Sequence, residues 1–271
     1  MQQKRTKAKK SLGQHFLNDR HAIQKIVDSL ELKSADSILE IGCGTGALTR
    51  QLVGMTRRYV GVELDKHLFQ ELDQALAGPQ TVFLNQNILT LDWGKLEDEH
   101  LPSGRKFKVV GNLPYNISSP IIGQLARKAD ILEMAVIMLQ AEVADRLMAL
   151  PGSKDYGVLT VLGQYYFECE PLFLVRPRAF NPPPRVVSKV VRLTPRPARP
   201  LLPSQEDPFL SFVKRCFSQR RKTLLNCLKG FRNGDVAKLR EFLKGQGYPL
   251  DVRAERISLD DFIMLYKELS T

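Results

Sequence analysis

The stretch SILEIGCGTGALTRQLV, residues 37–53, joins a short apolar run to a segment with helical spacing through a turn rich in glycine. Because glycine has no Cβ, such a turn can bend sharply and approach a ligand closely. A strand, a glycine turn and a helix in this order are typical of a nucleotide-binding βα unit. The stretch therefore predicts an α/β fold with a nucleotide site at the turn.

The glycines alone leave the ligand open, because Gly42, Gly44 and Ala47 also satisfy the dinucleotide fingerprint. Glu40 lies at the end of the first apolar run, where a carboxylate repels a pyrophosphate and suits a ligand with positive charge. Glu63 ends the next apolar run, about 20 residues beyond the turn, where an acidic side chain accepts hydrogen bonds from ribose hydroxyls. S-adenosylmethionine has an ammonium group, a sulfonium group and an unphosphorylated ribose, and these features favour it as the cofactor.

A second motif, NLPY at residues 112–115, follows a buried run at 107–111. Pro114 fixes its own φ and pushes Leu113 away from helical conformation, so Asn112 lies on a stiff turn. The side-chain oxygen of Asn112 and a backbone carbonyl can accept both N–H bonds of an adenine amine and so aim its lone pair at a methyl donor. Tyr115 is expected to stack on the base. The alternative is a proline turn with a half-buried tyrosine, and the position after a fourth strand favours the site.

Apolar runs that alternate with helical segments predict a doubly wound, mostly parallel sheet of seven strands with helices on both faces. Ligands bind such sheets beyond the carboxyl ends of the strands. Asn18 or Asp19 can cap a helix with an apolar stripe, which we expect to cover the cofactor site. The expected strands are 37–41, 59–63, 81–85, 107–111 and 134–140, and runs at 165–175 and 186–193 are expected to complete the sheet as a hairpin.

The segment TPRPARPLLPSQEDP, residues 194–208, is rich in proline and predicts a stiff linker. Apolar stripes at helical spacing after it predict a small α-helical domain. We therefore expect a basic arm at 1–11, a methyltransferase domain at 12–194, the linker at 195–208 and a helical RNA-binding or ribosome-binding domain at 209–271.

Five segments resemble, in order, signatures of the KsgA (RsmA) type of ribosomal RNA small-subunit adenine N6,N6-dimethyltransferase. The resemblance implies a class I, Rossmann-like methyltransferase that uses S-adenosylmethionine to dimethylate two adjacent adenosines near the 3′ end of 16S ribosomal RNA in the immature small ribosomal subunit. The segments are KSLGQHFLND at 10–19, EIGCGTGALT at 40–49, NLPYNISSP at 112–120, AFNPPPRVVSKVV at 179–191 and CFSQRRKTLLNCL at 216–228.

The resemblance also implies roles for individual residues. It implies catalytic or base-contacting roles for Asn112, Leu113, Tyr115 and Phe180. It implies cofactor contacts for His15, Leu17, Gly42, Gly44, Glu63, Asn87 and Asn112.

Two positions depart from the family pattern. Asn87 stands where an acidic residue usually accepts a bond from the cofactor's adenine amine. An amide oxygen can accept that bond without charge assistance, so we expect weaker cofactor affinity. Val187 stands where an aspartate commonly precedes Ser188, and nothing in the sequence explains its effect.

The chain of 271 residues has a formal net charge of +11, which indicates a polyanionic partner. Basic residues crowd the amino terminus, the triple-proline segment and the segment around residue 220. A solvated surface explains any one such patch, and three patches flanking the expected site favour RNA. The expected RNA contacts are Arg178, Arg185, Arg220, Arg221 and Lys222.

Other features narrow the class of protein. Cys43, Cys169, Cys216 and Cys227 lack the spacing of a zinc site or a disulfide framework, so we expect reduced thiols, no metal and a cytoplasmic protein. No apolar h-region follows the basic amino terminus, so a signal peptide is not expected. No run of about 18 apolar residues occurs, so a membrane span is not expected either. We expect a monomer.

Three other functions stay open. One is a large-subunit, 23S ribosomal RNA adenine N6-methylase of the macrolide-resistance type, although NLPYNISSP and FNPPP favour the small-subunit type. A DNA adenine methylase fits less well, because its catalytic tetrad usually continues with two prolines. The third is a non-catalytic ribosome-assembly factor that binds RNA, which Asn87 favours. Fold alone does not separate these functions.

Overall fold

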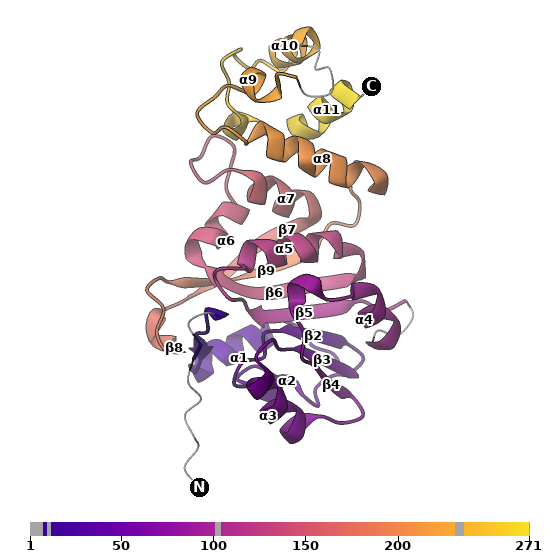
Figure 1. The fold of residues 1–271 in the computed structure, drawn as a ribbon, viewed down its shortest axis with the longest axis vertical. Coiled ribbons are helices and arrows are strands. Elements are labelled where there is room, and N and C mark those ends of the chain that lie inside the picture. Colours follow the sequence, from indigo (N-terminus) through magenta and orange to yellow (C-terminus); the bar gives the residue numbers. More distant parts are fainter. Residues whose placement is uncertain (1–7, 10–11, 101–103, 231–235, 271) are drawn as a thin grey trace. The chain divides into compact units, whose positions relative to one another are not determined.

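The computed structural model describes residues 8–9, 12–100, 104–230 and 236–270 (Figure 1). The expected basic arm at 1–11 lies outside the described residues, apart from Ala8 and Lys9.

The chain forms two compact units. The first unit comprises Met1–Ala144 and Phe167–Pro195, and the second comprises Asp145–Tyr166 and Arg196–Thr271. These units divide the chain differently from the expected domains, because Asp145–Tyr166 lies with the second unit.

A seven-stranded sheet in the order β4-β3-β2-β5-β6-β9-β7 forms the centre of the first unit (Figure 1). Strands β2 to β6 run parallel, and β9 runs antiparallel to both of its neighbours. The doubly wound sheet and its final antiparallel pair are confirmed, with strand ends within about two residues of those expected. The strands are β2 (Ser37–Ile41), β3 (Arg58–Val62), β4 (Thr81–Leu84), β5 (Phe107–Asn112), β6 (Leu132–Gln140), β7 (Phe167–Val175) and β9 (Ser188–Pro195).

Helices connect these strands, and a separate two-stranded antiparallel sheet joins β1 (Phe16–Leu17) to β8 (Phe180–Asn181). The α-helices are α1 (Arg20–Asp28), α2 (Thr49–Leu52), α3 (Lys66–Leu76), α4 (Trp93–His100), α5 (Ser118–Arg127) and α6 (Ala141–Leu147). The 3₁₀ helices are η2 (Ile88–Thr90), η3 (Ala129–Ile131) and η4 (Pro177–Ala179).

The central strands β2 and β5 are buried along almost their whole length, as expected where helices cover both faces of a parallel sheet. The chain moves outward from β2 to β4 and then returns to β5, so the strand order reverses between β2 and β5. Because parallel crossovers are right-handed, this reversal places the two sets of helices on opposite faces and leaves a crevice at the carboxyl ends of β2 and β5.

The capped helix after residue 19 is confirmed: the Asp19 side chain accepts the N–H of Ala22 at 2.9 Å at the start of α1. Its expected place over the cofactor site is wrong. The segment Leu12–Leu17, just before the helix, lines the pocket described below, while Ile26 and Val27 of α1 pack in the core. The apolar stripe of α1 faces the core, so the helix supports the pocket wall without forming it.

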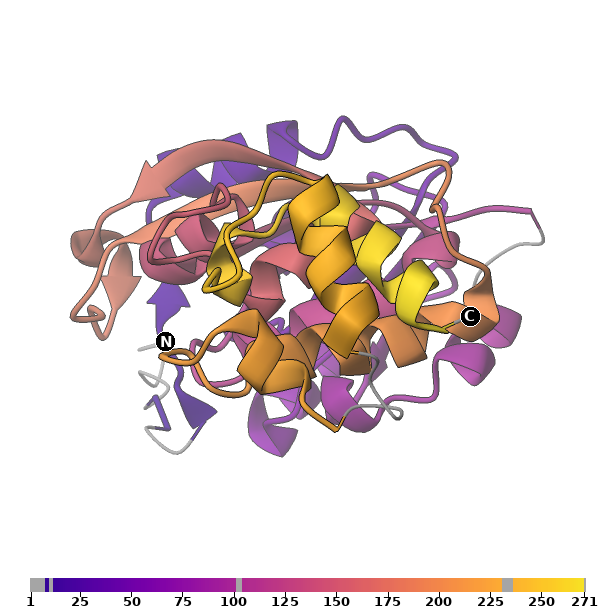
Figure 2. The same ribbon diagram turned by 90° about the horizontal axis from the view of Figure 1, so that it is seen from above.

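The second unit is helical, and α10 and α11 contact each other within it (Figure 2). Its helices are α7 (Val158–Tyr166), α8 (Pro203–Cys216), α9 (Leu224–Leu228), α10 (Val236–Gly245), the 3₁₀ helix η5 (Ala254–Arg256) and α11 (Leu259–Ser270). None of the helices in the described part of the chain is long and apolar enough to cross a membrane.

The expected boundaries of this unit need correction at two places. Residues 203–208 form the first turns of α8 instead of a linker. Pro203 stands at the first helical position, where a proline loses no intrahelical hydrogen bond, and the helix continues through Pro208. Helix α7 belongs to this unit because the Tyr165 ring packs on Phe209 at 5.3 Å and the Tyr166 hydroxyl donates to Glu206 at 3.0 Å.

A buried lysine lies near the amino end of β5, away from the crevice. Lys108, 1% exposed, donates from Nζ to the carbonyl oxygens of Leu30 at 3.0 Å and Glu31 at 2.8 Å, just beyond α1. It also pairs with the Asp36 carboxylate at 2.9 Å. The lysine therefore satisfies carbonyls that the end of α1 leaves without helical partners.

We predict that Lys108→Met lowers the free energy of unfolding by about 3–5 kcal/mol, because it removes the ion-pair partner of the Asp36 carboxylate and the donor to two carbonyl oxygens. Lys106→Met, at an exposed neighbouring position, is the control and should change it by less than about 0.5 kcal/mol. Urea unfolding followed by circular dichroism measures both. Equal stabilities of the two variants would show that the buried lysine has no such role.

Candidate active site

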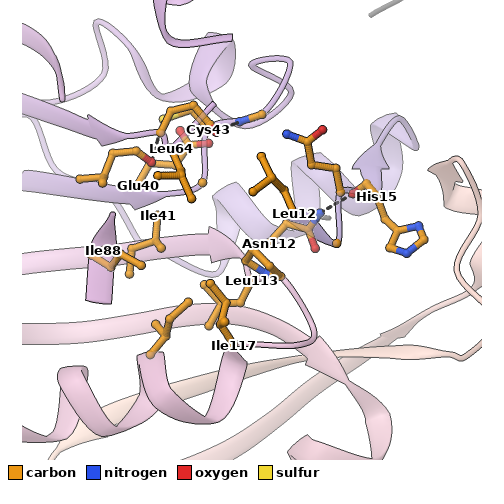
Figure 3. Close-up of a pocket in the computed structure, with 18 of the residues that line it drawn as sticks. Leu12, His15, Glu40, Ile41, Cys43, Leu64, Ile88, Asn112, Leu113 and Ile117 are labelled. Atoms are coloured by element: carbon orange, nitrogen blue, oxygen red, sulfur yellow. Dashed lines mark hydrogen bonds between the residues drawn. The ribbon is translucent and has the colours of Figure 1, made fainter. Parts of the chain in front are cut away.

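A single pocket collects most of the residues implied by the sequence. It lies at the carboxyl ends of β2 to β5 and is closed on one side by the segment Leu12–Leu17 (Figure 3). The expected site residues that line it are His15, Leu17, Gly42, Gly44, Glu63, Asn87, Asn112, Leu113 and Tyr115.

The glycine turn depends on backbone conformations that other residues rarely adopt. Gly42, Gly44 and Gly46 have φ values of 75°, 57° and 84°. A Cβ on Gly46 would lie 2.7 Å from a methyl carbon of Leu72, so a larger residue does not fit without rearrangement. The N–H of Gly42 donates to the carbonyl of Val62 at 2.8 Å and ties the turn to β3.

Glu63 lies at the end of β3 with its carboxylate under the glycine turn. One oxygen accepts the N–H of Gly44 and the other accepts the N–H of Asp65, both at 2.8 Å. Burial raises the pKa of Glu63, and these two N–H groups favour its charged form. Each oxygen has a second lone pair, so the carboxylate can also accept from hydroxyl groups of a ligand.

Glu40, expected to suit a cationic ligand, is buried in the structure. Its side chain lines the pocket (Figure 3) but is 1% exposed. It accepts a hydrogen bond of 2.5 Å from the Tyr59 hydroxyl. Burial raises the pKa of Glu40 to about 8, so the group is mostly protonated at neutral pH in the absence of a ligand. The expectation that Glu40 suits a cationic ligand stays a prediction, and the burial adds that its charge depends on its surroundings.

Asn112 ends β5 with its amide group held in one orientation. Its Nδ2 donates to the carbonyl oxygen of His15 at 2.8 Å, shown as a dashed line in Figure 3. The Leu113 N–H donates to Met138 at 3.2 Å and holds the same turn to β6. Since the donor end of the Asn112 amide is occupied, its acceptor end is available to a ligand.

Tyr115 contacts two other side chains in the structure. Its ring stacks on the ring of His15 with centroids 5.5 Å apart and planes at 26°. Its hydroxyl oxygen lies 2.7 Å from Oγ of Ser188, and burial raises the pKa of Tyr115, so the hydroxyl keeps its proton at neutral pH.

Phe180 does not line the pocket, unlike the other residues expected around the base. It is 3% exposed, lies in β8 opposite Leu17 and packs in the core. The β1–β8 pairing buries its ring, a long-range contact that the local sequence does not reveal. The contact of Phe180 with the base therefore stays a prediction.

Asn87 lines the pocket, but its side-chain oxygen already accepts a bond. It receives the N–H of Leu89 at 3.0 Å and so caps η2. The expected acceptor is thus shared with the backbone, which weakens it further as an acceptor for a ligand amine.

Sequence reasoning missed most of the apolar wall of the pocket, of which it had named only Leu113. The residues it missed are Ile88 after β4 and Ile117 after β5 (Figure 3), together with Ile121 of α5. Their position after parallel strands was a usable signal, because the carboxyl ends of such strands meet at one edge. Flat apolar rings pack well on side chains of this kind.

Sequence reasoning also missed a cluster of polar side chains that holds the segment Leu12–Leu17 in place. Asp65, the cap of α3, binds Nζ of Lys9 at 2.9 Å and Nε2 of Gln14 at 3.3 Å. These two contacts hold the segment before β1 against the residues that follow β3, so that Leu12–Leu17 form one wall of the pocket.

The expected RNA contacts fall into both units. In the first unit, Arg178 in η4 and Arg185 before β9 are exposed. In the second unit, Arg220, Arg221 and Lys222 are exposed between α8 and α9. Sequence reasoning missed two cations, Lys154 and Arg253, which line a hollow together with Arg220 and Arg221. The acidic residues Asp155 and Glu255 also line this hollow.

We predict that Glu40→Gln stabilises the protein in a pH-dependent manner. Between the ordinary pKa of 4.5 and the folded pKa of about 8, the unfolded chain releases a proton that the folded chain keeps. The wild type therefore loses stability as pH rises through this window, and glutamine, which still accepts the Tyr59 bond, does not. The gain in melting temperature should be small at pH 5, grow to about pH 8 and then level off.

Thermal unfolding at pH 5, 6.5 and 8.5 measures this difference. Glu97→Gln, at an exposed position of α4, is the control and should show little pH-dependent gain. A gain for Glu40→Gln that is equal at all three pH values would contradict the prediction.

Comparison with known proteins places this site in a family. The sequence pattern of the family "Ribosomal RNA adenine dimethylase" matches residues 5–270. The chain is 41% identical over 274 residues to "Ribosomal RNA small subunit methyltransferase A" of Francisella tularensis subsp. novicida, covering 99% of this chain and 100% of that protein.

Two solved structures have a similar fold. The dimethyladenosine transferase from Plasmodium falciparum has a TM-score of 0.75 at 24% identity and covers 94% of this chain and 98% of its own. The 23S rRNA methyltransferase ErmE has a TM-score of 0.69 at 28% identity and covers 94% of this chain and 100% of its own. With the full-length match, these findings show that the chain belongs to the ribosomal RNA adenine dimethylases, a family of S-adenosylmethionine-dependent methyltransferases.

Proposed function

We propose that the protein forms N6,N6-dimethyladenosine at two adjacent adenosines near the 3′ end of 16S ribosomal RNA in the immature small ribosomal subunit. The observation that carries the proposal is the bond from Asn112 to the carbonyl of His15. It leaves one neutral acceptor at the mouth of a pocket suited to a nucleoside, which is the group that an adenine amine needs. The small-subunit name of the relative in Francisella tularensis supports the choice of RNA.

The reaction needs orientation more than acid–base chemistry. An adenine amine is a weak nucleophile because its lone pair is conjugated with the ring. When Asn112 and a backbone carbonyl accept its two N–H bonds, the nitrogen lone pair is steered towards the methyl donor at the expense of its conjugation with the ring. The cofactor would supply the methyl group from its sulfonium: the N–C bond would form as the S–C bond breaks, S-adenosylhomocysteine would leave, and the methylated nitrogen would lose one proton to water. The stiff turn at Leu113 and Pro114 holds the acceptors in place during transfer.

The pocket residues fit the cofactor. Glu63 would accept the ribose hydroxyls, and the apolar side chains of Ile88 and Ile117 would pack on its adenine. The positive charge of the cofactor would favour the ionised form of Glu40, so binding would release a proton from that group. Asn87 would contact the adenine edge with the weakened acceptor described above.

Basic residues in each unit would contact RNA phosphates. These contacts would come from Arg178 and Arg185 in the first unit and from Arg220, Arg221 and Lys222 in the second. Lys154 and Arg253 share the hollow with Arg220 and extend that footprint. Each cation that neutralises a phosphate adds to the salt dependence of binding. The oligomeric state that we propose is a monomer.

The proposed reaction predicts a product that can be detected directly. Small subunits that lack this methylation are incubated with the protein and S-adenosylmethionine labelled in its methyl group, and the RNA is digested to nucleosides. We expect labelled N6,N6-dimethyladenosine from the 3′ region of 16S RNA. Label in 23S RNA alone would support the large-subunit alternative, and tight particle binding without label would support the assembly factor.

The second prediction concerns Asn112. Asn112→Ala removes the acceptor and should lower the methylation rate by about 10²–10³-fold, the usual effect of losing one orienting group. The dissociation constant of the variant for the small ribosomal subunit, measured without cofactor, should stay within about twofold of the wild-type value.

Asn112→Asp is the matched variant, since it keeps an acceptor but loses the N–H that binds His15. We expect a similar loss of rate, because a carboxylate oxygen and the His15 carbonyl repel each other. Full activity of Asn112→Asp would mean that the orientation of the amide is unimportant.

A further inference from the structure

Ser188 is a buried hydroxyl group beside the catalytic turn. It is the first residue of β9 and is 0% exposed, whereas the preceding Val187 is 38% exposed. Its backbone lies between Gln140 of β6 and Val175 of β7. The two neighbouring strands therefore fix the position of Ser188. Its Oγ lies 2.7 Å from the hydroxyl oxygen of Tyr115.

Tyr115 is held at both of its ends. Its carbonyl oxygen accepts the hydroxyl of Ser118 at 3.2 Å, which holds the backbone of the turn to the start of α5. The bond to Ser188 holds the far end of the ring. Without that second bond, the ring can turn about its side-chain torsions, because its exposed face meets solvent or the ring of His15.

The segment that leads to Ser188 also holds the His15 ring, on which Tyr115 stacks. Nδ1 of His15 lies 2.8 Å from the carbonyl oxygen of Pro182, and the imidazole stacks on Tyr115. Residues 181–188 thus hold His15 by a carbonyl and Tyr115 by a hydroxyl. The carbonyl of His15, in turn, holds the amide of Asn112.

We propose that Ser188 is a positioning residue for methyl transfer: its hydroxyl sets the tilt of the Tyr115 ring, and this ring sets the target base against Asn112. The inference rests on the proposed function, in which Tyr115 faces the base. A displacement of about 1 Å of a positioning group can cost as much as 10²-fold in rate, so one hydroxyl is enough to matter.

The experiment compares Ser188→Ala, Tyr115→Phe and the double variant. Each single change removes the same hydrogen bond, so we expect each to lower the single-turnover methylation rate by about tenfold and the double variant to be no slower than either. The dissociation constant for S-adenosylmethionine, measured by calorimetry without RNA, should stay within about twofold of the wild type. Ser188→Thr keeps the hydroxyl and should recover most of the rate.

Ser37→Ala is the matched control, because Ser37 is also a buried serine at the start of a strand and its hydroxyl has no hydrogen-bond partner in the described structure. It should methylate at the wild-type rate. A wild-type rate in Ser188→Ala, or losses that multiply in the double variant, would overturn the inference. So would a matching loss of cofactor affinity, which would indicate a general structural defect.

A crystal structure of Ser188→Ala gives a readout that needs no turnover. A Tyr115 ring displaced from its stack on His15 supports the inference, and an unmoved ring overturns it. If the wild type itself transfers no methyl group to small-subunit RNA, the proposed function fails, and the ring position in this variant still decides whether Ser188 positions Tyr115.

Discussion

The close approach of β2 and β5 is the constraint on which the site depends. Gly111 in β5 permits it, because a Cβ at this position would lie 2.6 Å from the carbonyl oxygen of Ile41. The two strands therefore end side by side, and the glycine turn after one faces the asparagine turn after the other. A Cβ on Gly42 would lie 4.0 Å from the carbonyl oxygen of Asn112, which shows how near the turns are. Because the glycine turn and the asparagine turn lie this close together, residues of both turns line the same pocket.

The segment before α1 completes the pocket by contacts at both of its ends. Lys9 and Gln14 bind Asp65 beyond β3, and His15 binds both Asn112 and Pro182. Residues far apart in the sequence thus hold the amide group of Asn112 in a single orientation. Beneath the turn, burial keeps Glu40 neutral in the absence of a ligand, so the pocket holds a group whose charge depends on what binds. Such a group lowers the stability of the folded protein when it is ionised, and its negative charge can then strengthen the binding of a cationic ligand.

Much of the fold could be predicted because its signals are local. Apolar runs marked β2 to β6 within about two residues, and Asp19 marked the start of α1. The boundary of the second unit was less accessible, because α7 joins that unit through the packing of Tyr165 on Phe209, which no local pattern reveals. The prolines near residue 203 suggested a linker, yet proline also suits the first turn of a helix, and composition alone does not separate these two uses.

The sequence by itself determined the family, the positions of the strands along the chain and the residues at the two turns, because motif spacing and hydrophobic period are properties of neighbouring residues. Only the tertiary structure decided what each side chain can do. Burial made Glu40 neutral, the pairing of β1 with β8 removed Phe180 from the pocket, and β9 brought Ser188 to Tyr115. The reason is physical: protonation, exposure and hydrogen bonding depend on which distant atoms exclude water, and the chain specifies those contacts only by folding.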